Sequence, residues 1–208
     1  VEDVGFLRTV QFAEDAGPMA HSVRPNSYME ISNFYTVTIY EKGAEVVRMQ
    51  ANLLGPETFR QGTDLYFERF DGQAVTTEDF VQTMEEVSGL DLTQFRRWYT
   101  QSGPPRLDVT GSYDASNQSY TLHVEQSCPP TPDQLEKEAF YIPLRAGLIG
   151  PNGESLPLHL NGDLSDEELV LHVKEAAQDF IFENISVKPV PSLLKGFSAP
   201  IKLVYPYS

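Results

Sequence analysis

The chain has 208 residues, of which 40% are hydrophobic, so it can bury the core of one large domain or two small ones. Its 15 Lys and Arg against 30 Asp and Glu give a formal charge of -15 at pH 7, which repels polyanions, so we expect no nucleic-acid partner. No run approaches about 18 consecutive apolar residues, so we expect no membrane span. The single cysteine, Cys128, cannot form an internal disulfide and fits a reducing cytoplasm.

The first helical pattern is short and leads into a loop. Residues 3–14 are moderately amphipathic, and Gly17-Pro18 ends the pattern. Residues 19–33 follow neither the helical nor the strand period and include Pro25. This combination predicts an ordered loop.

The central helix is predicted to run from near Thr36 to Gly55. It is apolar on almost every side between Val37 and Leu54, and a helix with so wide an apolar arc lies inside a domain. A polar group buried there needs a hydrogen-bond partner, and Tyr40 is such a group. From the residues alone, the simplest interpretation of Tyr40 is a core tyrosine whose hydroxyl makes one hydrogen bond.

The second and third helices are each marked at both ends. Pro56 opens the second helix, because proline suits the first helical position, and Asp71-Gly72 ends it. Residues 76–79 form a capping arrangement for the third helix, which stops at Gly89. The large apolar residues expected to face inward from these two helices are Phe59, Tyr66, Phe67, Phe70, Phe80, Met84 and Val87.

A fourth helix is predicted from Asp91, as its cap, to Gln101, and Gly103-Pro104-Pro105 ends it. Its inward residues are expected to be Leu92, Phe95, Trp98 and Tyr99. These helices precede the proline pair without a strand among them. We therefore place a domain boundary between residues 103 and 104.

Beyond this boundary the apolar residues alternate with a period of two, as they do in strands. The alternation predicts a hairpin with a turn at 114–118 and about seven strands in roughly 100 residues. The segment from Pro189 to Pro191 is interpreted as a connection. The apolar alternation covers residues 107–113, 120–124, 140–148, 156–160, 169–173, 180–182 and 201–205. The number and spacing predict an antiparallel β-sandwich, and hence an α+β chain of two domains.

A family resemblance is carried by four stretches: Gln11 to His21, Arg24-Pro25, Tyr40-Glu41-Lys42-Gly43-Ala44 and Phe95 to Gly103. Together they resemble the zinc-dependent aminopeptidase N family, the gluzincin aminopeptidases, and most closely its bacterial form. The likeness extends over nearly all 208 residues. It implies that residues 1–103 are the helical end of a thermolysin-like catalytic domain and that residues 104–208 are an Ig-like β-sandwich.

The resemblance also implies roles for individual residues. The family's tyrosine at the position of Tyr40 points its phenol at the zinc-bound carbonyl and stabilises the oxyanion of the tetrahedral intermediate. A phenol stays a protonated donor at neutral pH, and a preorganised donor of this kind is worth on the order of 10²–10³ in rate. Tyr35 and Asn33 would line the pocket for the first residues of the substrate, with aromatic packing as the alternative. Glu41 and Lys42 are expected to be solvated or salt-bridged.

The family's zinc ligands do not occur in this sequence. The family holds zinc with H-E-x-x-H and a later Glu, and no H-E-x-x-H is found here. None of the four histidines has another at the i+4 spacing: His21, His123, His159 and His172. The resemblance therefore implies an internal piece of the enzyme that by itself binds no zinc and cleaves nothing. His21 is interpreted as a hydrogen-bonding structural group.

The expected partners are peptide substrates and the remaining domains of the same polypeptide, in a monomeric cytoplasmic enzyme whose full-length form holds zinc. The alternative from another class is a noncatalytic protein-interaction module made of helices and a sandwich. A related enzyme that kept the tyrosine and opens epoxides is a further alternative. The close run from Gln11 to Met49 favours the bacterial aminopeptidase.

Overall fold

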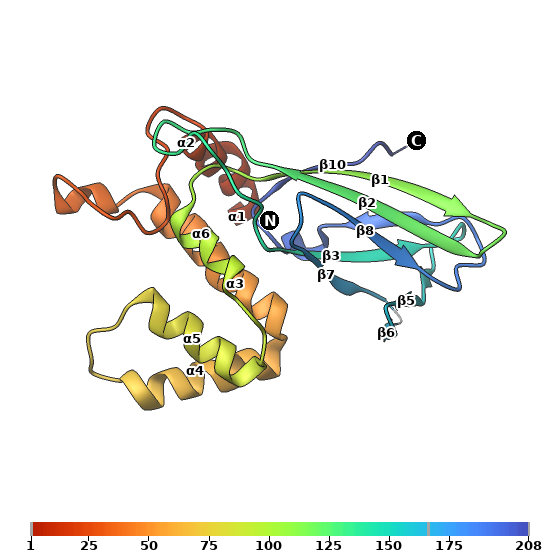
Figure 1. Cartoon of the computed structure of the whole chain (residues 1–208), viewed down its shortest axis with the longest axis horizontal. Coiled ribbons are helices and arrows are strands. Elements are labelled where there is room, and N and C mark those ends of the chain that lie inside the picture. Colours follow the sequence, from red (N-terminus) through yellow and green to blue (C-terminus); the bar gives the residue numbers. More distant parts are fainter. Residues whose placement is uncertain (1, 166, 208) are drawn as a thin grey trace.

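The computed structural model describes residues 2–165 and 167–207. Figure 1 shows most helices at one end of the molecule and the strands at the other, in agreement with the predicted α+β fold. No helix among the described residues is long and apolar enough to cross a membrane. The helical segments are α1 (Glu2–Phe6), η1 (Leu7–Gln11), α2 (Phe12–Asp15), η2 (Ile31–Phe34), η3 (Thr38–Lys42), α3 (Gly43–Leu54), α4 (Pro56–Phe70), α5 (Thr77–Ser88), η4 (Gln94–Arg96), α6 (Arg97–Thr100) and η5 (Lys195–Phe197).

Local signals placed the ends of the longer helices correctly. Gly55 separates α3 from α4 with a positive φ of 77°, and Pro56 is the first residue of α4. The capping box of α5 is present, because Thr76 and Asp79 bond reciprocally through side chain and backbone. Gly89 ends α5 in the left-handed conformation.

The regular part of the fourth helix is shorter than expected, and one residue expected to face inward is exposed. The Asp91 carboxylate accepts from the Thr93 amide, as a capping side chain does, and the Leu92 amide donates to Glu85. The Arg96 amide donates to the Leu92 carbonyl at 3.2 Å, and regular structure begins with η4. Phe67 is exposed, because its neighbour Tyr66 makes the contact with α5 through Phe80, at 5.2 Å between ring centroids.

The strands form two four-stranded sheets and one two-stranded ribbon. One sheet has the order β10-β1-β2-β8; in the other, β4 and β7 pair with β3, and β9 also pairs with β3. The strands are β1 (Arg106–Asp114), β2 (Ser119–Ser127), β3 (Ile142–Ile149), β4 (Ser155–Leu156), β5 (Leu158–Leu160), β6 (Asp163–Ser165), β7 (Leu169–Val173), β8 (Ala177–Phe182), β9 (Val190–Leu193) and β10 (Lys202–Val204).

The predicted sandwich is confirmed, although its described residues form ten strands instead of about seven, because 156–160 divides into β4 and β5, and β6 and β9 were not predicted. The pairing is not purely antiparallel, because β10 runs parallel to β1, with Arg106 opposite Lys202. The segment from Pro189 to Pro191 is not only a connection, since Pro191 lies in β9 opposite Leu148. Among the described strands β9 pairs with β3 alone, so the missing amide of Pro191 can face away from the ladder.

The helices pack on the sandwich through a buried aromatic junction. Trp98 in α6 is fully buried, its indole donates to the Tyr141 carbonyl at 2.7 Å, and its ring lies 4.5 Å from that of Phe140. A second contact joins α3 to the other side of the junction, where Asn52 donates to the Ser198 carbonyl at 2.9 Å. Trp98 thus faces inward, as expected for the fourth helix, and its partners belong to the sandwich.

Candidate functional site

The turn that carries Tyr40 is held at its start by polar contacts. The Thr36 hydroxyl accepts from the Ile39 amide at 3.2 Å, as a capping side chain does. The Thr38 amide, which has no partner within its own helix so close to the start, donates to Glu14 at 2.7 Å. The five residues Thr38–Lys42 form η3, a π-helical turn that continues into α3. Such turns are rare and occur often at functional sites.

Tyr40 lies at the surface, contrary to the expectation that it is buried in a core. Its side chain is 57% exposed, and that of Tyr35 is 72% exposed. The two rings lie 6.1 Å apart between centroids and tilt by 36°. Both line a surface hollow of about 530 Å³ whose remaining wall is apolar: Ile31, Phe34, Ile39, Gly43, Ala44 and Val47. The Tyr40 helix therefore has its apolar arc only partly covered.

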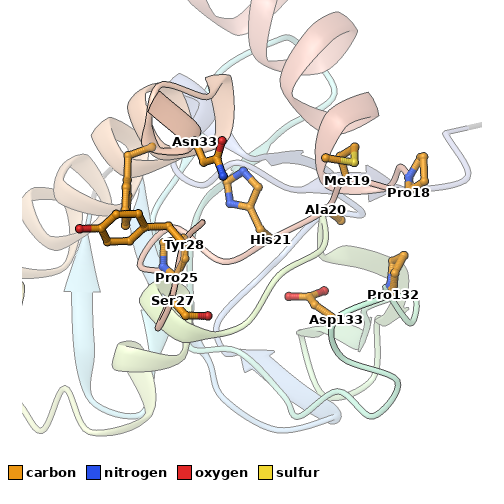
Figure 2. Close-up of a pocket in the computed structure, with 11 residues that line it drawn as sticks. Pro18, Met19, Ala20, His21, Pro25, Ser27, Tyr28, Asn33, Pro132 and Asp133 are labelled. Atoms are coloured by element: carbon orange, nitrogen blue, oxygen red, sulfur yellow. The ribbon is translucent and has the colours of Figure 1, made fainter. Parts of the chain in front are cut away.

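Asn33 lines a pocket that adjoins the hollow. The structure therefore brings Tyr35 and Tyr40 together in the hollow and places Asn33 in the neighbouring pocket. This pocket has a volume of about 420 Å³. Figure 2 shows Asn33, from η2, and His21, from the loop before η2, on one side of it and Asp133, from the loop after β2, on another. Phe34 lines both the pocket and the hollow. The three candidate residues thus lie along one continuous stretch of surface.

His21 is hydrogen-bonded on one side only. Its Nδ1 donates to the Ser22 carbonyl at 2.8 Å, which agrees with a structural interpretation. Its Nε2 is buried and has no hydrogen-bond partner among the described residues. A buried polar atom without a partner is costly, so the site has the capacity for one more polar contact here.

The described residues of this chain offer no site for the zinc that the resemblance implies for the full-length enzyme. Within residues 2–165 and 167–207, no group of three or more His, Cys, Asp or Glu side chains is placed to hold a metal ion. We therefore derive no catalytic step through a metal held by this chain.

Lys42 is the feature of the site that sequence reasoning missed. It does not pair with Glu41 in solvent: its side chain is 1% exposed and binds Asp15, also 1% exposed, at 2.6 Å. Its Nζ also donates to the Gly103 carbonyl at 3.1 Å and lies 5.9 Å from the centroid of a Trp98 ring. A lysine within an apolar arc is the signal that could have indicated a buried partner.

The comparisons with known proteins cover nearly the whole chain. The model described as "Peptidase family M1 domain" matches residues 6–99, and the model "Domain of unknown function (DUF3458) Ig-like fold" matches residues 103–206. Aminopeptidase N of Haemophilus influenzae is 52% identical over 207 residues, which is 100% of this chain and 24% of that protein. The first half of the chain, residues 6–99, belongs to peptidase family M1, and the second half is the Ig-like DUF3458 domain. This membership confirms the resemblance found in the sequence.

Two further relatives are aminopeptidases by name. Aminopeptidase N of Escherichia coli is 50% identical over 208 residues, 100% of this chain and 24% of the relative. The crystal structure of Legionella pneumophila aminopeptidase A in complex with aspartic acid is 30% identical, with a TM-score of 0.75 over 100% of this chain and 24% of that one. The chain thus spans about a quarter of the length of these relatives.

Proposed function

We propose that this chain is part of a zinc-dependent aminopeptidase, in which Tyr40 donates a hydrogen bond to the oxyanion that forms when the first peptide bond of a substrate is attacked. Membership of peptidase family M1 and the printed names of the relatives support this activity. The observation that carries the residue assignment is the exposed Tyr40 phenol on an apolar hollow, held by a rare π-helical turn.

Tyr40 would stabilise the oxyanion electrostatically. The negative charge on the former carbonyl oxygen grows as the tetrahedral intermediate forms, and a donor already in place stabilises it without reorganising. Polar contacts at both ends of η3, through Thr38 and Lys42, limit how far the phenol can move. The Tyr35 ring, 6.1 Å away, would provide an aromatic wall for the substrate's first side chain.

Asn33 would offer an amide donor and acceptor to the substrate's first residues from the adjoining pocket. Zinc, the base that activates water and the groups that bind the free amine would come from residues of the longer protein outside this chain. We place the boundary between the two domains at residues 103 and 104, assign the protein to peptide catabolism in the cytoplasm, and expect it to act as a monomer. The 208-residue chain by itself would hydrolyse nothing.

The test is Tyr40→Phe in a protein extended to the length of the relatives. The replacement removes one hydroxyl and leaves the ring, so we expect kcat on an alanyl anilide to fall by on the order of 10²–10³ while the thermal midpoint stays unchanged. Tyr207→Phe is the matched control, because Tyr207 is equally exposed but lies after β10 and outside the hollow, so the loss of its hydroxyl should leave kcat unchanged. A near-normal kcat for Tyr40→Phe would remove the proposed role.

A further inference from the structure

We propose that Asp15 and Lys42 are positioning residues for Tyr40. The π-helical turn η3 carries the Tyr40 phenol, and the buried Asp15–Lys42 pair attaches this turn to the backbone of Gly103, where the sandwich begins. This inference rests on the proposed function of Tyr40. Neither residue reaches the hollow itself, since both side chains are 1% exposed.

Asp15 and Lys42 both bind the backbone of Gly103 and each other. Asp15 uses both carboxylate oxygens: one accepts from Lys42 Nζ at 2.6 Å and the other from the Gly103 amide at 2.7 Å. Lys42 closes the loop by donating to the Gly103 carbonyl at 3.1 Å. Three chain segments are thus joined by charge-assisted bonds in a site without exposure to water. Gly103 adopts a φ of 96° there, which favours glycine.

The cluster of Asp15, Lys42 and Gly103 contacts the π-helical turn η3 at the last residue of the turn. Lys42 is the last residue of η3 and follows Tyr40 by two positions, so their side chains leave opposite faces of the helix. Lys42 therefore anchors the turn from the core while Tyr40 faces the hollow. The preceding residue of α2, Glu14, binds the Thr38 amide at the other end of the same turn. Adjacent carboxylates of α2 thus hold both ends of the π-helical turn.

The free energy of unfolding does not account for a buried ion pair at this position. An apolar pair of similar volume often stabilises a core as well as a buried ion pair does. A buried pair does constrain geometry, because breaking it leaves an uncompensated charge. A misplacement of about 1 Å at a reacting group can lower a rate on the order of 10²-fold. Control of the Tyr40 position is the role that these contacts support.

The experiment is a double-mutant cycle in the longer protein. Lys42→Met alone would leave the buried Asp15 carboxylate without a counter-charge. The clamp variant therefore combines Lys42→Met with Asp15→Asn, and the side-chain oxygen of the asparagine still accepts from the Gly103 amide. We expect kcat on an alanyl anilide to fall about 10-fold or more, with KM changed by less than about 3-fold. In a Tyr40→Phe background the same replacement should have no further effect on kcat, because the group it positions is gone.

The outcomes separate the two proposals. Equal fold losses of kcat with and without the Tyr40 hydroxyl would overturn the positioning role, and so would an unchanged kcat in a folded clamp variant. An unchanged kcat for Tyr40→Phe alone would instead refute the proposed function. Asp15→Asn by itself is a harsher second variant for the same cycle, because it leaves the buried Lys42 charge without its carboxylate, and kcat should fall at least as far. The matched control is Arg60→Met with Asp64→Asn, an exposed ion pair of α4 whose removal should leave kcat intact.

Discussion

Replacing Phe140 by alanine tests whether the helices and the sandwich unfold together. Phe140 is buried at the junction, and its ring lies 4.5 Å from that of Trp98, tilted by 39°. Removing a buried phenylalanine ring costs about 3–5 kcal/mol, because its transfer free energy is lost and a cavity remains. Domains of ordinary stability have only about 5–15 kcal/mol in total, so the variant should unfold much more easily in urea.

The assay uses the single tryptophan of the chain. Trp98 fluorescence reports the junction and far-UV circular dichroism reports the whole fold. With a slope of about 2–3 kcal/mol per M urea, the expected loss lowers the midpoint by about 1–2.5 M in both signals. Ile181→Ala, at an exposed position of β8, is the control and should change stability by no more than about 0.5 kcal/mol. A fluorescence transition that moves while the dichroism stays would refute a shared cooperative unit, as would a shift no larger than the control.

Two further predictions concern single polar contacts. Thr76→Ala removes the side-chain acceptor of the α5 capping box with Asp79 and should lower the free energy of unfolding by about 1 kcal/mol in urea titration; an unchanged midpoint would contradict the cap. Asp179 and Glu125 raise the pKa of His123 above its ordinary 6.5, so the stabilisation is fully present below that pH and is lost as pH rises through the raised pKa. Asp179→Asn should lower the pKa of His123 in an NMR titration, and an unmoved pKa would refute the contact.

Much of the fold was predictable because its signals are local. A glycine that tolerates positive φ, a proline at the first helical position and a capping box act over four residues or fewer, so they placed the ends of α3, α4 and α5. The hairpin of β1 and β2 was predictable for the same reason, since its strands are joined by one short turn.

The sheet order was not predictable in this way. β10 lies parallel to β1 although almost 100 residues separate Arg106 from its partner Lys202 along the chain. Alternation of apolar residues shows which face of a strand is buried, but it carries no information about which strand is the neighbour or in which direction it runs. The short strand β9 was missed because Pro191 is a poor strand residue unless it lies at an edge.

The sequence by itself determined the family, the presence of Tyr40 on a helix and the lack of an H-E-x-x-H motif, because each of these is contained in a short run of residues. Only the tertiary structure decided that Tyr40 faces outward and that Lys42 faces inward to Asp15, 27 positions away. A wide apolar arc shows that a helix is covered on several sides but not which side is left open. The partner of a buried charge, likewise, is set by the packing of distant segments.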